Sequence, residues 1–174
     1  VPGVLLDVDG PLEYIAVTKG GTKAYESLLE LNVNAFEFNL ACILIGLDSN
    51  HAKNSGFHFD PEPVQGDPVH IGVNWSWEGK QVETPAEGML LDQGQPVKPG
   101  TWVYTGSSFT PDNRYLAELD GTLIGFVHDP ASIIEHQMGL GLGNYGALQA
   151  DRNVLPPVGT PVTLTVRRLV SKGP

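Results

Sequence analysis

The sequence contains a single cysteine among its 174 residues. Cys42 therefore has no partner for a disulfide bond within the chain. One thiolate cannot hold an iron–sulfur cluster, which needs about four, and it cannot form a zinc site made of several thiolates. We therefore expect no iron–sulfur cluster, and we predict that Cys42, in an apolar stretch, is a small core residue.

Basic residues are few. The chain has 10 Lys and Arg against 20 Asp and Glu, which gives a formal net charge of -10. Charged residues of both signs make up 17% of the chain, below the roughly 25% of typical soluble domains. An acidic surface repels phosphate backbones, so we expect no nucleic-acid partner.

Long apolar runs are lacking as well. No stretch approaches the ~20 apolar residues that cross a bilayer as a helix, so the chain is predicted not to span a membrane. No basic segment followed by an apolar one indicates a signal peptide within this sequence. Glycine and proline, by contrast, are plentiful, with 21 and 14 residues, and 41% of the chain is hydrophobic. This composition is typical of a folded chain that is rich in turns.

The strongest helical pattern covers residues 34–46. Asn34 suits the N-cap position, and Glu37 follows three residues later, where the partner of a capping box belongs. Apolar residues occupy nearly every side of this segment, which is typical of a buried helix. We therefore expect the helix to pack against a sheet.

Most of the remaining chain is predicted to form strands. Residues 69–77 alternate between apolar and polar types, which favours a core position for Trp75 and Trp77, and Glu78-Gly79 suits a hairpin turn. Asp120-Gly121 is expected to join a second hairpin. The other predicted strands cover residues 12–18, 24–31, 102–105, 114–119, 122–127 and 162–168. The expected fold is a single α+β domain over residues 1–174, with mostly antiparallel, twisted sheet packed on one main helix at residues 34–46.

Histidine and carboxylate side chains gather in one long polar segment. His51, His58 and His70 lie in or beside it, together with Asp60, Glu62 and Asp67. Imidazole and carboxylate groups are common ligands of zinc and other divalent ions. No His-Glu-x-x-His spacing places two ligands on one helix face, so solvent-exposed loop histidines are the alternative interpretation.

Complete catalytic patterns are missing. Residues 141–146 read Gly-Leu-Gly-Asn-Tyr-Gly, but the long helix and the later acidic residue of a dinucleotide site do not follow. Gly106-Ser107-Ser108 lacks the nucleophile elbow of serine hydrolases. The sequence therefore favours binding over catalysis.

One segment near the N-terminus resembles a known family. Residues 20–29 read Gly-Gly-Thr-Lys-Ala-Tyr-Glu-Ser-Leu-Leu. They are similar to the YdjY-domain proteins, a bacterial family of unassigned biochemical role, in which a strand ending in Gly-Lys-x-His-Glu-Ser is typical. The resemblance continues in the same order along most of the chain, at residues 41–47, 69–77, 102–107, 115–127 and 155–162.

The resemblance implies an exported or lipid-anchored bacterial protein, and hence an extracytoplasmic location. It also draws attention to Lys23, Tyr25, Glu26 and Ser27 as candidate ligand-binding residues. Tyr25 stands where the family commonly has histidine, which weakens a metal or proton-transfer role at that position. If this segment is a strand, Lys23, Tyr25 and Ser27 share one face. A structural role, with Lys23 paired to Glu26 or to another carboxylate, is the other interpretation.

Taken together, the residues and the resemblance predict a non-catalytic, extracytoplasmic module for binding or assembly. Its partner would be a protein, a small molecule or a glycan, and no cofactor is predicted. The first alternative is a metal-binding protein or metal-dependent hydrolase that uses a divalent ion in the His51–His70 loop. The second is an accessory subunit of a redox complex.

Overall fold

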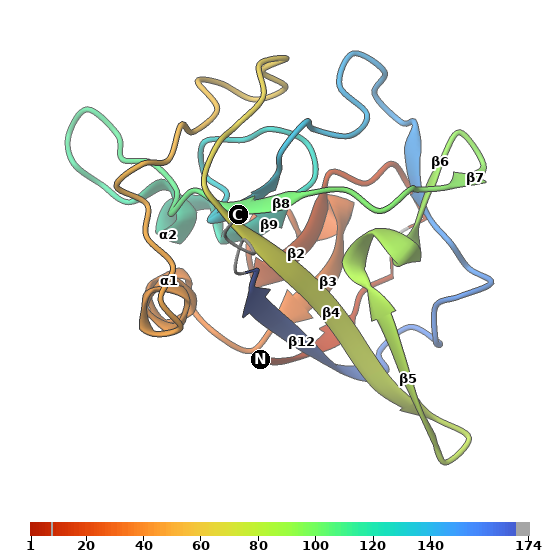
Figure 1. Cartoon of the computed structure of the whole chain (residues 1–174). Coiled ribbons are helices and arrows are strands. Elements are labelled where there is room, and N and C mark those ends of the chain that lie inside the picture. The colour runs from red at the N-terminus through yellow and green to blue at the C-terminus, as the bar shows by residue number, and fades with distance from the viewer. Residues whose placement is uncertain (8, 170–174) are drawn as a thin grey trace, which may run out of the picture.

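Eight strands of the protein pair edge to edge and close into a β-barrel (Figure 1). The computed structural model describes residues 1–7 and 9–169. In chain order the barrel strands are β1 (Pro2–Leu5), β2 (Tyr14–Thr18), β3 (Ser27–Leu31), β4 (Asp67–Trp77), β8 (Trp102–Tyr104), β9 (Thr122–Gly125), β10 (Ile134–His136) and β12 (Pro161–Arg168). Around the barrel their order is β12, β1, β3, β2, β9, β10, β8 and β4.

The pairing of β4 with β12 closes the barrel. Residues 69–74 of β4 run antiparallel to residues 163–168 of β12. On its other edge β4 pairs with β8 over residues 67–69. The β2–β3 and β9–β10 pairs are parallel, and the other barrel pairs are antiparallel.

The second half of β4 extends beyond the barrel as a hairpin with β5 (Lys80–Pro85). Glu78 and Gly79 form its turn with positive φ angles of 48° and 75°, as a type I′ turn requires, so the predicted hairpin is confirmed. The 3-10 helix η2 (Ala86–Met89) then leads to a three-stranded sheet. Its strands are β6 (Leu90–Asp92), β7 (Gln95–Pro96) and β11 (Leu148–Ala150).

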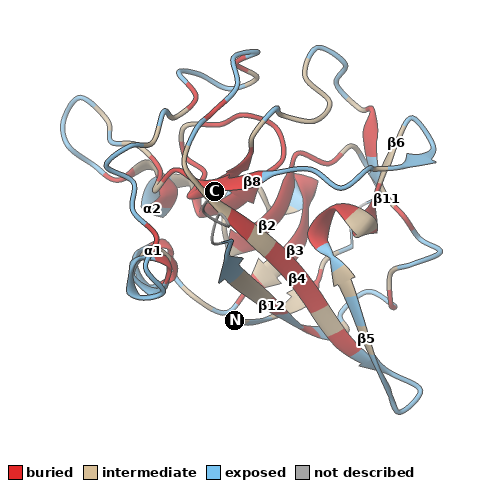
Figure 2. Ribbon diagram, viewed as in Figure 1, coloured by how far each residue is buried: buried red, intermediate tan, exposed pale blue. Residues whose placement is uncertain are grey.

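Helix α1 (Ala35–Leu44) confirms the predicted helix but not its environment. Asn34 accepts a hydrogen bond from the Glu37 backbone N–H at 2.8 Å, and the capping box is complete. The expectation of an α+β sheet packed on this helix is wrong, because the sheet closes on itself and its inner face is filled by strand side chains. The helix lies outside the barrel and buries one side, with Ala35, Phe38 and Cys42 (Figure 2).

Two predicted strands also take other structures. Residues 116–120 form the short helix α2 (Leu116–Asp120), and Gly121 ends it in the left-handed conformation with φ 73°. The same Asp-Gly pair that suits a hairpin turn therefore serves as a helix C-terminus. Residues 24–26 form the 3-10 helix η1 (Ala24–Glu26), and β3 starts only at Ser27.

The tryptophans divide between core and surface. Trp75 is 4% exposed, in line with its place in the alternating pattern, and Trp102 is buried, with its indole N–H donating to Glu87 Oε2 at 3.0 Å. Trp77 is 44% exposed, because β4 has left the barrel at that point and pairs there only with β5. Cys42 is buried, as predicted, and burial raises the pKa of its thiol to about 12.

Two adjacent titratable residues are buried on β10. Glu135 Oε2 accepts hydrogen bonds from the Asp129 N–H and the Ser55 hydroxyl, both at 2.9 Å, while its Oε1 has no hydrogen-bond partner. Burial raises the pKa of Glu135 to about 7 and lowers the pKa of His136 to about 4. Glu135 therefore contributes stability that is lost as pH rises towards 7, and His136 contributes stability that is lost as pH falls towards 4.

Replacing Glu135 with Gln should remove the first of these dependences. Wild type loses stability between pH 4.5 and pH 7 and the variant does not. The difference in the free energy of unfolding, Glu135→Gln minus wild type, should therefore rise by about 3 kcal/mol over this range. Urea unfolding across this pH range measures the difference. His136→Gln is the control. Its free energy of unfolding, minus that of wild type, should fall as pH rises over the same range. A Glu135→Gln difference that is constant with pH would contradict the assignment.

Candidate ligand-binding site

A polar groove of about 470 Å³ lies where three connections of the barrel meet. The first is the segment that leaves β2, residues 18–22, and the second is the turn from β3 into α1. The third is the C-terminal end of α2, residues 118–121. The groove is therefore walled in part by the segment that resembles the YdjY family.

The topology explains why this segment runs across the groove. Because β2 and β3 are parallel neighbours, residues 19–26 must lead the chain from the end of β2 back to the level where β2 begins. The segment is held to α2 by backbone hydrogen bonds from Thr18 to Gly121 at 2.8 Å and from Thr22 to Asp120 at 3.0 Å. A Cβ on Gly21 would lie 3.1 Å from the Thr18 oxygen and 3.2 Å from the Gly121 oxygen, so the close approach favours glycine there.

Acidic groups dominate the groove. Glu37, Glu118 and Asp120 line it with carboxylates, against the single ammonium of Lys19. No hydrogen bond from a described residue reaches the Asp120 carboxylate, which is half-buried. Burial and the charge of Asp129 raise the pKa of Asp120, while Lys23 acts to lower it. The groove thus presents acceptors to a ligand that donates hydrogen bonds.

An ion pair holds the far end of the same segment. Lys23 Nζ lies 3.0 Å from Glu26 Oε1, although the angle is not that of a hydrogen bond. Burial acts to lower the pKa of Lys23, but Glu26 outweighs it and the pKa is raised. The predicted pairing of Lys23 with Glu26 is confirmed. The predicted strand faces are wrong, because in the 3-10 helix η1 residues three apart lie on the same side.

Further charged groups surround this pair. His58 Nε2 lies 2.8 Å from Glu13 Oε2, and this contact raises the pKa of His58. The Tyr14 hydroxyl donates to Asp129 Oδ2 at 2.5 Å, and burial together with Asp129 raises the pKa of Tyr14. Glu13, Tyr14 and Asp129 are buried. Sequence reasoning missed these partners, since the contacts join residues 45 and 115 positions apart.

The four predicted ligand-binding residues differ in accessibility. Tyr25 is 67% exposed, and the Lys23 side chain is 26% exposed. Glu26 and Ser27 are buried, and the Ser27 hydroxyl donates to the Lys23 carbonyl at 2.7 Å. None of the four lines the groove itself. Glu26 and Ser27 therefore position the segment, Lys23 is paired with Glu26, and Tyr25 is the most exposed of the four.

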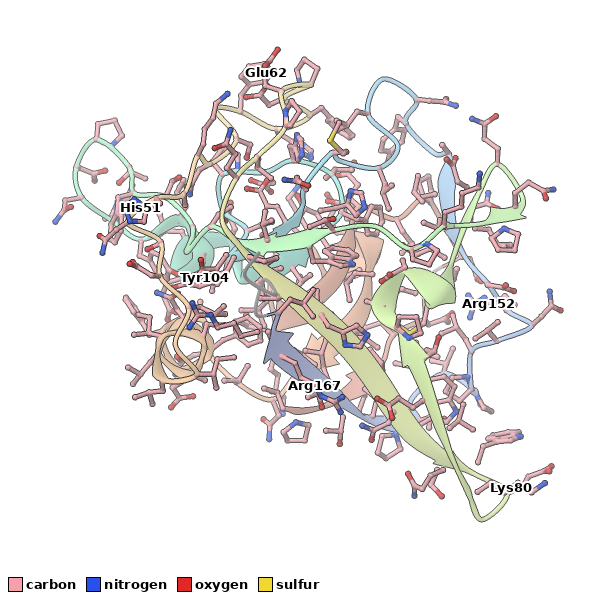
Figure 3. The ribbon with its side chains drawn as sticks, in the orientation of Figure 1. His51, Glu62, Lys80, Tyr104, Arg152 and Arg167 are labelled. Atoms are coloured by element: carbon pink, nitrogen blue, oxygen red, sulfur yellow. The ribbon has the colours of Figure 1, made fainter. Side chains whose placement is uncertain are left out.

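The predicted metal-binding residues lie at separate places. His51 is exposed in the turn after α1, His58 pairs with Glu13, and His70 lies on β4 opposite Arg167 of β12. Figure 3 shows His51 and Glu62 well apart along the loop. Asp60 uses its carboxylate to accept backbone N–H groups of Gly56 and Glu62.

No group of three or more His, Cys, Asp and Glu residues that could hold a metal ion is present in residues 1–7 and 9–169.

A family model, that of the YdjY domain, matches residues 8–167 and so covers most of the chain. No curated protein and no solved structure gives a significant match. Within the described part of the chain, no helix is long and apolar enough to cross a membrane.

Removing the ammonium of Lys23 should destabilise the fold, because Glu26 would remain buried without a cation. We expect Lys23→Met to lower the free energy of unfolding by about 2 kcal/mol. The double variant, Lys23→Met with Glu26→Gln, should regain part of this lost stability. Chemical denaturation of both variants measures this. Lys19→Met, at an exposed lysine of the same segment, is the matched control. Equal losses in the single and double variants would argue against a structural ion pair.

Metal analysis of untagged protein tests the His51–His70 hypothesis directly. We expect zinc, iron and copper well below one equivalent per chain, because His58 and Asp60 already have protein partners. About one equivalent that is lost in His58→Ala would reverse this expectation and restore the metal hypothesis.

Proposed function

The chain belongs to the YdjY-domain family, and we propose that it is a non-catalytic binding module that takes a small polar ligand in the groove beside residues 18–22. The ligand donates hydrogen bonds and has no net negative charge, so hydroxyl and ammonium groups are the chemistry that fits. We extend the proposal to an extracytoplasmic location, which the family resemblance implies. Cell fractionation with an antibody to the native protein tests this location.

The position of the Asp120 carboxylate is the main support for this proposal. It lines the groove, it is half-buried, and no described residue donates a hydrogen bond to it. The carboxylate opens into the groove and is not among the buried polar atoms without a partner, so a ligand that donates a hydrogen bond can reach it. Glu37 and Glu118 add negative charge at the same groove, which disfavours anionic ligands.

The groups next to the groove support binding over catalysis. Lys23 is paired with Glu26, and Tyr14 donates to Asp129, so these side chains are engaged with one another. Such a network holds the segment of residues 19–26 in one conformation. A preformed wall costs less ordering entropy when a ligand binds.

Titration of ¹⁵N-labelled protein with two probes, glucose for hydroxyl groups and putrescine for ammonium groups, tests the proposal by NMR. We expect the amide signals of Gly20, Gly21 and Thr22 to shift with at least one probe. For the ammonium probe, Asp120→Asn should weaken binding at least about tenfold, because a charge-assisted hydrogen bond is lost.

Glu78→Gln is the matched control, because it removes a carboxylate from the β4–β5 turn, away from the groove. Its affinity should equal that of wild type. If neither probe shifts the groove amides, or if Asp120→Asn binds the ammonium probe as tightly as Glu78→Gln does, the proposal is wrong.

A further inference from the structure

Helix α1 presents an apolar face that nothing in the described chain covers. Five large apolar side chains of the helix and its C-terminal end are exposed, by between 47% and 77%: Phe36, Leu40, Ile43, Leu44 and Ile45. Figure 2 shows the outer side of the helix as exposed and its inner side as buried. Glu37 is the one charged residue between Ala35 and Leu44.

Neighbouring side chains enlarge this face. The ring of Phe36 lies 5.2 Å from that of Tyr115, which lies 5.2 Å from that of Phe109. Phe109 and Leu119 are themselves exposed. Ile45 lies on the opposite side of the helix from Phe36 and is left out of this area. With roughly 200 Å² for each large side chain, the exposed part of the remaining face amounts to about 700 Å². A typical monomer exposes at most about 300–600 Å² in one patch, whereas a stable interface buries about 800 Å² on each partner.

The same face has both a protrusion and a hollow. Leu44 is the most exposed of the five side chains, at 77%. Beside it, between α1 and β12, lies a groove of about 210 Å³ with a mainly apolar lining that includes Phe38, Ala41, Cys42, Ile45, Leu164 and Val166. An apolar cavity of about 150 Å³ is large enough for a benzene molecule, so this groove has room for a leucine side chain.

We propose that two copies of this chain pack through their α1 faces around a twofold axis. In this arrangement Leu44 of each copy enters the groove between α1 and β12 of the other. A twofold interface needs a protrusion and a matching hollow on one surface, and the α1 face has both. Glu37 on the helix and Arg168, whose Nη1 lies beside Gly46 at the end of the helix, are charges of opposite sign. The face itself therefore does not repel a second chain of net charge -10.

The same charge pattern disfavours a lipid surface. Helices that lie on membranes have Lys and Arg on their polar side, and α1 has neither. The acidic surface also repels anionic headgroups. Residual repulsion between two acidic copies is screened by salt, so the dimer should strengthen as ionic strength rises.

Sedimentation velocity of the whole chain over a hundredfold range of concentration tests the proposal. We expect a reversible monomer–dimer equilibrium that shifts towards dimer in higher salt. Leu44→Glu should raise the dissociation constant at least a hundredfold, because a carboxylate would enter an apolar groove. Met138→Glu, at another exposed apolar residue outside this face, should leave the dissociation constant of the dimer unchanged.

Circular dichroism spectra of both variants that match wild type would show that the fold is intact. A wild-type chain that stays monomeric at every concentration would overturn the proposal, as would a Leu44→Glu variant that dimerises normally. A monomer that binds vesicles of neutral lipid through α1 would replace it with a membrane role. The polar groove shares Glu37 and Leu119 with this side of the molecule, so sedimentation is measured without glucose or putrescine. Each outcome then reports on the α1 face alone.

Discussion

The pairing of β4 with β12 is the constraint on which the rest of the structure depends. It joins residues 69–74 to residues 163–168, so a strand near the C-terminus completes a sheet that starts at Pro2. Once the sheet is closed, its inner face is filled by strand side chains, so a helix can pack only on the outside of the barrel. This is why α1 lies outside the barrel with much of its apolar surface exposed.

Closure of the barrel also determines where the polar groove forms. The strand order makes β2 and β3 parallel neighbours, so residues 19–26 must cross from one end of the pair to the other. The same order brings the end of α2 beside that crossing segment, which forms the polar groove. The ion pair of Lys23 with Glu26 and the hydrogen bond from Tyr14 to Asp129 hold the surrounding chain in place.

Local features were predictable from the sequence, and distant ones were not. The capping box of α1, the turn at Glu78-Gly79 and the pairing of Lys23 with Glu26 depend on neighbours within a few residues. The barrel and the contacts of Glu13 with His58 depend on long-range pairing, for which a single sequence has no local signal. Gly121 illustrates a true ambiguity, because a left-handed glycine suits both a hairpin turn and a helix C-terminus.

Amide hydrogen exchange measured by NMR shows whether a closed barrel holds these elements together as one unit. If the barrel is closed, the amides that pair β4 with β12 open only with global unfolding, so their exchange gives the same free energy as that of the buried strands β2 and β3. Amides of β12 that exchange by local opening at a much lower free energy would show that the sheet is open between β4 and β12 and not a closed barrel.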